Sequence, residues 1–123
     1  MCTLSFFVDG SSGYSVFFNR DEAKTREKGH VPSLLTSKEV SFLSPLDPQG
    51  KGTWFSVNEY GMTFALLNNY DAPFINTDRS RGSVIPSLVD VKSLSEVEAL
   101  LKDMELETLN GFILFVLDIT GCH

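Results

Sequence analysis

The strongest constraint on the fold is an uninterrupted apolar run near the end of the sequence, "FILFVL", at residues 112–117. Six consecutive apolar residues, several of them aromatic or β-branched, are typical of a central strand that is covered on both faces. A central strand also needs neighbours in its sheet, yet the residues that follow, "DITGCH", begin a turn. We therefore expect that the next strand is missing, and that the chain is a fragment, a processed piece or a unit completed by another copy.

Two β-hairpins are predicted upstream of this run. The strand-like segments 2–8 and 14–19 flank "DGSSG", which is a turn sequence. The segments "TWFSV" and "MTFALLN" flank "NEYG", in which Asn58 and Gly61 favour a turn. Because such short connections join neighbouring antiparallel strands, we expect an antiparallel sheet.

Loops and short regular elements are expected between and after these hairpins. Residues 20–32 are charged and loop-like, a short strand is expected at 40–43, and "SPLDPQG" reads as the turn after it. The segment "NYDAPFINTDRS" reads as a long loop. Residues 83–90 are expected to be helical, with Pro86 in the first turn, where a proline is tolerated.

The clearest helix is predicted from Leu94 to Met104. Ser93 and Glu96 form a capping-box pattern at its start. Four apolar residues at helical spacing define one buried face, namely Leu94, Val97, Leu101 and Met104. Together with the strands, this helix predicts a single α+β domain that covers residues 1–123.

Charge and hydropathy exclude several classes of protein. Sixteen acidic and ten basic residues give a net charge of -6, which argues against a nucleic-acid partner. The opening apolar run lacks a basic region before it and is interrupted by Asp9, so no targeting segment is predicted. The longest apolar run is too short to span a membrane. We therefore expect a cytoplasmic location.

The sequence contains two cysteines, Cys2 and Cys122. We do not expect them to form a disulfide, because disulfides are rare inside cells. Neither belongs to a C-x-x-C pair of the kind that binds a metal. We accordingly predict no metal site and no cofactor.

The position of Cys2 suggests chemistry. Its small side chain favours removal of Met1, which would leave a thiol and a free α-amino group on one residue. A free α-amine titrates at roughly pH 7.7 to 8.0, so it can accept a thiol proton at neutral pH without help from a histidine. The two histidines, His30 and His123, are poorly placed for a Cys–His pair. The alternative is that Cys2 is a small core residue at the start of a strand.

Two groups of polar residues follow predicted strands and are candidates for the same site. In "NRDE", which begins at Asn19, Arg20 can hold a carboxylate and Asp21 can hold an α-ammonium group. Asn68, at the end of "ALLN", can direct a side-chain N–H at an oxyanion. The alternatives are a solvated strand end for "NRDE" and a turn for the asparagine.

A further candidate lies in "SRGS", just before the predicted helix at 83–90. There Arg81, with backbone N–H groups, can bind an anionic group of a substrate. An ordinary helix cap, with a glycine for close packing, explains the same residues. Asn19 and Arg81 are therefore the candidate substrate-binding residues.

Taken together, these segments resemble a known family. "MC", "NRDE", "GTW" at residues 52–54, "ALLNNY", "SRG" and "NGF" at residues 110–112 occur in the order found in the NRDE family, also called the transport and Golgi organisation family. Members look like N-terminal-nucleophile hydrolases, so the resemblance implies a four-layer αββα sandwich, here incomplete. "VNEYGM" followed by "ALLN" is also similar to the choloylglycine and penicillin acylase branch of that superfamily.

The resemblance implies roles for individual residues. Cys2 would be the nucleophile and, through its amine, the base. Asp21 would orient the amine, Arg20 would be the active-site arginine and Asn68 would contribute to the oxyanion hole. Trp54 is assigned to packing. The chain departs from the family at Lys51, where consecutive glycines usually precede "TW", and in its length, because members are roughly twice as long.

Two functions are consistent with this sequence. The first is a cysteine amidohydrolase that cleaves a small non-peptide amide through an acyl-enzyme on Cys2. The alternative is a non-catalytic family member that binds or traffics a lipid-like or haem-like ligand, with a Golgi or mitochondrial association. In either case we expect self-association or a missing C-terminal half to complete the fold.

Overall fold

The computed structural model describes residues 1–10, 13–119 and, as backbone, 121–122. The strands are β1 (Thr3–Asp9), β2 (Gly13–Asn19), β3 (His30–Ser37), β4 (Val40–Leu46), β5 (Phe55–Asn58), β6 (Thr63–Asn68), β7 (Phe112–Asp118) and β8 (Gly121–Cys122). The helical elements are the α-helix α1 (Leu94–Asp103) and three single 3₁₀ turns, η1 (Arg81–Ser83), η2 (Ile85–Ser87) and η3 (Leu106–Thr108).

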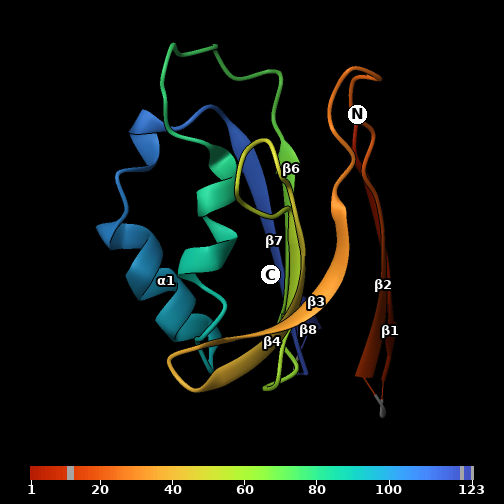
Figure 1. Cartoon of the computed structure of the whole chain (residues 1–123). Helices are drawn as coiled ribbons and strands as arrows, with labels where there is room; N and C mark the ends of the chain where they lie inside the picture. The colour runs from red at the N-terminus through yellow and green to blue at the C-terminus, as the bar shows by residue number, and fades with distance from the viewer. Residues whose placement is uncertain (11–12, 120, 123) are drawn as a thin grey trace.

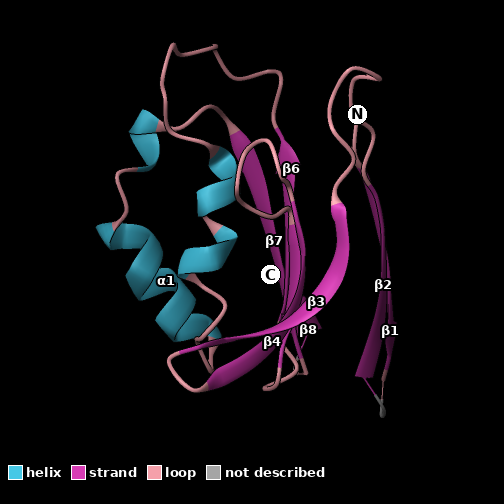
Figure 2. Cartoon of the chain, viewed as in Figure 1, coloured by secondary structure: helices cyan, strands magenta, loops and turns pink. Residues whose placement is uncertain are grey.

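The strands form two antiparallel sheets. The hairpin β1–β2 stands alone, and the other strands form a six-stranded sheet in the order β3-β4-β5-β6-β7-β8. The helical elements cover one face of the larger sheet and the hairpin lies against the other, so the described residues form three layers (Figures 1 and 2). The expected α+β class with antiparallel sheets is confirmed.

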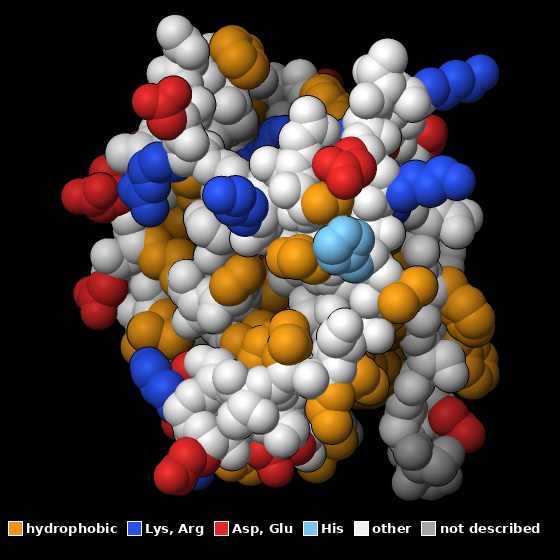
Figure 3. Space-filling model, in the orientation of Figure 1, with side chains coloured by type: hydrophobic (Ala, Val, Ile, Leu, Met, Phe, Trp, Pro, Cys, Tyr) orange, Lys and Arg blue, Asp and Glu red, His pale blue; other side chains and the backbone are white. Residues whose placement is uncertain are grey.

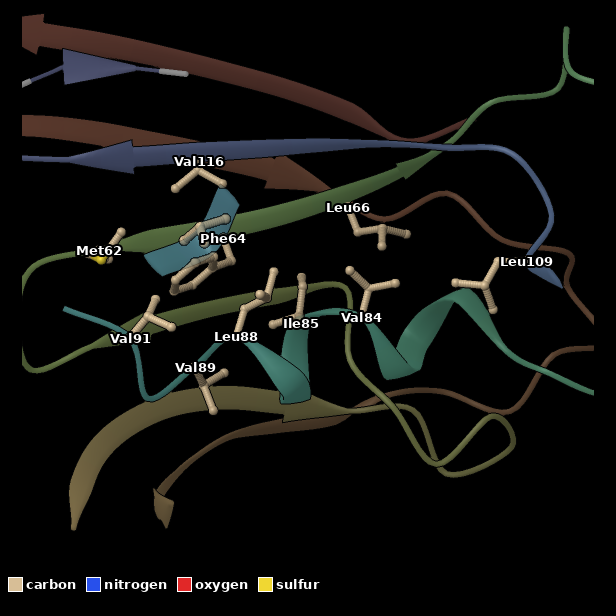
Figure 4. Close-up of a cluster of buried hydrophobic side chains, with 11 residues drawn as sticks. Met62, Phe64, Leu66, Val84, Ile85, Leu88, Val89, Val91, Leu109 and Val116 are labelled. Atoms are coloured by element: carbon tan, nitrogen blue, oxygen red, sulfur yellow. The ribbon is translucent and has the colours of Figure 1, made fainter. Parts of the chain in front are cut away.

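The main core lies between the six-stranded sheet and the helical layer. Phe64 of β6 is fully buried at its centre, and Ile85, Leu88 and Val97 close over it from the helical side. Figure 4 shows Phe64 on the sheet facing Ile85 and Leu88 from the segment that carries η1 and η2. Burial of each such side chain contributes roughly 1.5–3 kcal/mol, so this layer contact is a principal source of stability.

The predicted helix is confirmed, and it ends one residue early. The Ser93 hydroxyl accepts a hydrogen bond from the Glu96 amide at 3.4 Å. The Glu96 carboxylate reaches one residue beyond the usual capping-box partner and accepts from the Lys92 amide at 2.7 Å. Val97 is buried, and the other three residues of the predicted face pack against the core from its edge.

The second layer contact joins the hairpin to the opposite face of the sheet. The rings of Phe6 and Phe115 lie 5.1 Å apart between centroids. The Tyr14 hydroxyl donates to the Gly61 carbonyl at 2.6 Å, and burial raises the pKa of this hydroxyl. Because the hairpin has only two strands, it covers the larger sheet incompletely. Ile113 of β7 is consequently 54% exposed, and the expectation that this strand is covered along both faces is met only in part.

The strand expected to be missing after β7 is present in a short form. β8 pairs with Leu117 and Asp118 at the end of β7. Among the described residues, the rest of that edge of β7 has no strand beside it. The prediction that no strand follows was therefore wrong, because Gly121 and Cys122 pair with the end of β7.

The segment at 20–32 was also predicted incompletely. Its last residues, from His30, begin β3, and the register shifts between His30 and Ser33. Pro32 lies at this irregularity in an edge strand, where a missing N–H breaks no ladder bond. The turn to β4 is made by Lys38 and Glu39, both with positive φ, so the usual glycine or asparagine signal of a hairpin is absent.

Two other elements differ from the prediction in extent. β4 continues to Leu46 and takes in the first three residues of the segment expected to be a turn. The helix expected at 83–90 is instead the pair of 3₁₀ turns η1 and η2. Pro86 lies within the first two positions of η2, where its missing N–H is tolerated. Among the residues that the structure describes, no helix is long and apolar enough to cross a bilayer.

Candidate functional site

A cavity of about 230 Å³ brings together four of the six predicted site residues. Cys2, Arg20, Asn68 and Arg81 all line it, from the starts and ends of elements that are distant in the sequence. Figure 1 shows the N-terminus and the outgoing end of β6 at the same end of the molecule. Asn19 and Asp21 are not among its lining residues.

Arg20 is held in place by three neighbouring side chains. Its guanidinium carbon lies 4.0 Å from the ring centroid of Trp54, in a cation–π arrangement. Its Nη2 donates to Asp47 Oδ2 at 3.2 Å, and its Nε lies 3.7 Å from Glu22 Oε1. Trp54 therefore does more than pack, because it also lines the cavity and supports the arginine.

Asp47 connects two arginines and was not predicted as a site residue. Its Oδ2 accepts hydrogen bonds from both Arg20 and Arg26, and the residue is 8% exposed. Burial alone would disfavour the charged carboxylate, but the bonds from Arg26 and from two backbone amides outweigh it. The pKa of Asp47 is therefore below its ordinary value. Asp47 carries a negative charge that fixes the position of Arg20.

Asp21 lies next to the N-terminus in space and does not line the cavity. Its Oδ2 pairs with the Met1 ammonium at 3.0 Å, and both groups are exposed. This is the kind of contact expected for Asp21, made here to the amine of Met1 instead of Cys2. Cys2 itself is a half-buried free cysteine. The side chain of Cys122, and all of His123, lie outside the described residues.

Asn68 is engaged by a neighbouring side chain. Its Nδ2 donates to the Tyr70 hydroxyl at 2.9 Å, and Tyr70 also lines the cavity. An amide nitrogen carries two N–H donors, so this bond orients the group and occupies one of them. The arrangement is compatible with the predicted role of Asn68 in an oxyanion hole.

The motifs "ALLNNY", "SRG" and "NGF" meet around Arg81. Arg81 Nη1 donates to the Gly111 carbonyl at 3.0 Å, and the Asn69 amide donates to the same carbonyl at 3.0 Å. A Cβ on Gly111 would lie 3.1 Å from the Asn69 carbonyl oxygen and closer still to Ala72. The glycine is thus needed for the close approach that fixes the guanidinium at the cavity.

The glycines of "GTW" and "SRG" touch each other directly. The Thr53 amide donates to the Gly82 carbonyl at 3.1 Å. A Cβ on Gly52 would lie 2.8 Å from Gly82 Cα and closer still to its carbonyl. A side chain at Gly52 would therefore separate two walls of the cavity.

The departure from the family at Lys51 coincides with a special backbone conformation. Lys51 has φ 55°, in the left-handed region that glycine adopts readily and other residues at a cost. This explains in physical terms why a glycine suits the position. The Lys51 amide donates to the Asp47 carbonyl at 2.7 Å, which closes the turn that contains this conformation.

Sequence reasoning missed Asp47 and Arg26, and treated Trp54 as packing alone. Asp47 was part of a segment read as a turn, and Arg26 was one charge in a charged loop. Neither has a local signal of function, because their contacts join segments about 20 residues or more apart. Within the described ranges, no group of three or more His, Cys, Asp or Glu side chains is placed to hold a metal ion.

Comparison with known proteins identifies the family. No curated protein and no solved structure matched the chain. The family model for Transport and Golgi organisation 2 matches residues 1–123, which is the whole sequence. The chain therefore belongs to the Transport and Golgi organisation 2 family.

Proposed function

We propose that the chain is the nucleophile-bearing part of a cysteine N-terminal-nucleophile amidohydrolase that acts on a small amide. The observation that carries the proposal is the shared cavity of Cys2, Arg20, Asn68 and Arg81. Candidate nucleophile, oxyanion donor and cations converge there from segments with no reason to meet in an arbitrary sequence. The family membership and the order of the motifs support the same reading.

The reaction would proceed through a thioester. The Cys2 sulfur attacks the amide carbonyl carbon, and its proton passes to the α-amine of the same residue. Asn68 donates to the developing oxyanion. When the C–N bond breaks, the leaving amine takes the proton. Water then attacks the thioester, which releases a carboxylic acid and restores the thiol.

Removal of Met1 is a requirement of this mechanism. While Met1 is present, the nitrogen of Cys2 belongs to a peptide bond and cannot accept a proton. The Met1 ammonium lies 3.0 Å from Asp21 Oδ2. This contact supports the proposal that the Asp21 carboxylate can hold an α-amine at this place. After cleavage, Asp21 would hold the amine of Cys2 and keep it beside the thiol.

The finer fold assignment belongs to the same proposal. We place the chain as a single domain, residues 1–123, that forms the N-terminal half of a four-layer αββα sandwich. The incompletely covered sheet face beside the hairpin supports it, because further strands alongside the hairpin would bury residues such as Ile113. We also propose a cytoplasmic location, because the longest apolar run in the sequence is too short to span a membrane.

The test combines mass, labelling and turnover. Intact mass spectrometry of the purified full-length protein should show loss of Met1 and, with a slowly hydrolysed amide, one added acyl group. Cys2→Ala should abolish both the adduct and the turnover of an amide panel, while the matched control Cys122→Ala should keep them. Retained Met1, or a Cys2 that labels with maleimide no faster than Cys122, would contradict the proposal.

An observation that favours the alternative is an apolar hollow between the hairpin and the larger sheet. It measures about 450 Å³ and is lined by Val16, Phe55, Val57 and Ile119 among others. A non-catalytic member could hold a lipid-like or haem-like ligand there. Binding of such a ligand that is unchanged in Cys2→Ala and lost in Val57→Asp, with no turnover of any amide, would favour this function. A Golgi or mitochondrial association belongs to the same alternative and is tested by localising the tagged protein in cells.

A further inference from the structure

The charges around the cavity do not balance. Its charged lining residues are three arginines and two acids, namely Arg20, Arg26, Arg81, Glu22 and Asp47. The first two arginines are compensated by the two acids through the ion pairs at Asp47 and Glu22. One positive charge is left over, and it belongs to Arg81.

Arg81 is fixed without being neutralised. Its hydrogen bond goes to the Gly111 carbonyl, which is uncharged, and the ion pairs of the described residues do not include it. A guanidinium has five N–H donors, so most of them remain available after this bond. Since the Asn69 amide holds the same carbonyl, the position of the guanidinium is set by the backbone and not by a ligand.

Two hydroxyl groups on the cavity wall have protons to donate. The Tyr70 oxygen accepts from Asn68, and the Ser80 oxygen accepts from the Gly82 amide at 3.1 Å. Because each oxygen acts as an acceptor in these bonds, its own proton is free for a different partner. The cavity therefore presents a fixed cation and two hydroxyl donors, a set that matches a carboxylate.

We propose that the substrate of this site is a small amide that carries a carboxylate, and that Arg81 rather than Arg20 binds that carboxylate. The inference rests on the proposed function, since it specifies the substrate of the same cavity. A volume of about 230 Å³ is below the ~300–1,000 Å³ of sites for drug-sized ligands, so the substrate is compact. The chain's net charge of -6 repels anions in general, which makes the local cation the means of selection.

The closing experiment measures binding apart from catalysis. Glutarate, a compact dicarboxylate, and glutaramide, its neutral isostere, are titrated at low ionic strength into the full chain bearing Cys2→Ala, followed by amide chemical shifts in NMR. Glutarate should bind at least tenfold more tightly than glutaramide. Arg81→Gln should remove this preference, because it removes the positive charge. The fold should be kept, because the new side-chain amide still has an N–H that can donate to the Gly111 carbonyl.

The control is an arginine two residues away. Arg79 is exposed, pairs with Glu105 at 3.4 Å and does not line the cavity, so Arg79→Gln should leave glutarate binding unchanged. Tyr70→Phe should weaken glutarate binding severalfold, because it removes one donor without removing charge. Both variants should keep the wild-type melting temperature within a few degrees, which shows that the protein remains folded.

The results separate this inference from the proposed function. Equal binding of glutarate and glutaramide, or undiminished glutarate binding in Arg81→Gln, overturns the inference even when Cys2 hydrolyses neutral amides. Loss of binding in Arg20→Gln with no loss in Arg81→Gln also overturns it. Arg81-dependent binding of glutarate supports the carboxylate site even when no amide in the panel is hydrolysed, in which case only the hydrolase assignment fails.

Discussion

Arg20 Nη2 donates a hydrogen bond to Asp47 Oδ2 at 3.2 Å, although the two residues lie in different segments of the chain. The same oxygen accepts from Arg26, so one buried carboxylate organises two cations. The Arg20 guanidinium also lies over the ring of Trp54. The side chain of Arg20 is only 15% exposed, and two of its partners, Asp47 and Trp54, lie outside the "NRDE" segment to which it belongs.

Asp47→Asn should destabilise the fold in a pH-dependent way. The pKa of Asp47 is lowered in the folded state, so its contribution is present above the ordinary value of 3.8 and is lost as the pH falls through the lower folded-state pKa. At pH 7 we expect a loss of about 1.5–3 kcal/mol, which is typical of hydrogen bonds to charged groups. Urea unfolding at pH 7 and below pH 3.8 should show the variant approaching the wild type at acid pH.

The control for this variant is Asp78→Asn, at an exposed aspartate in the long loop. Its unfolding free energy should follow that of the wild type at each pH. A difference between wild type and Asp47→Asn that stays constant or grows as the pH falls would contradict the ion-pair account. The substitution would then act through packing or the turn and not through the charge.

Gly52→Ala should lower stability because the new Cβ meets the backbone of Gly82. Backbone cannot move aside as a flexible side chain does, so we expect a loss of about 1–3 kcal/mol. Gly10→Ala is the matched control, since a Cβ there meets no atom within 4 Å. Thermal unfolding of both variants checks this, and an equal melting temperature for the two would show that the contact with Gly82 is unimportant.

Lys51→Gly should raise stability. The lysine adopts φ 55°, and glycine reaches this conformation without the steric cost that a Cβ imposes. After allowing for the greater freedom of glycine in the unfolded chain, we expect a gain of about 0.5–1 kcal/mol. Lys24→Gly, at an exposed lysine whose φ is not positive, should be neutral or destabilising. The denaturant midpoint should therefore rise for Lys51→Gly, and it should fall or stay unchanged for Lys24→Gly.

Asn58→Asp should be strongly destabilising despite its similar size. The buried Asn58 Nδ2 donates to the carbonyls of Val89 and Val91 at 3.1 and 2.8 Å, which ties the turn after β5 to the helical layer. A carboxylate cannot donate, and it would face two carbonyl oxygens, so we expect a loss of about 3 kcal/mol or more at neutral pH.

The asparagine control is Asn69→Asp. The side-chain oxygen of Asn69 accepts from the Asp71 amide at 3.1 Å, which an aspartate can also do. Its stability should change by less than 0.5 kcal/mol or so, as for substitutions away from buried features. Comparable losses in the two variants, measured by urea unfolding, would mean that the bonds to Val89 and Val91 contribute little.

Local patterns in the sequence were sufficient for the elements whose signals are local. The hairpin β5–β6 and the helix α1 were predicted because turn residues, capping residues and apolar spacing act over a few neighbouring positions. β3 was missed because an edge strand needs little apolar alternation, and its turn at Lys38 and Glu39 lacks glycine.

By itself, the sequence determined the family and the identity of the candidate nucleophile, because short ordered motifs and a cysteine at position two are features of the chain alone. Only the tertiary structure decided which charges oppose one another. Asp47 and Glu22 compensate Arg20 and Arg26, whereas Arg81 donates to the uncharged carbonyl of Gly111. These pairings depend on how distant segments meet, and electrostatic interactions depend on distance and burial rather than on order in the sequence.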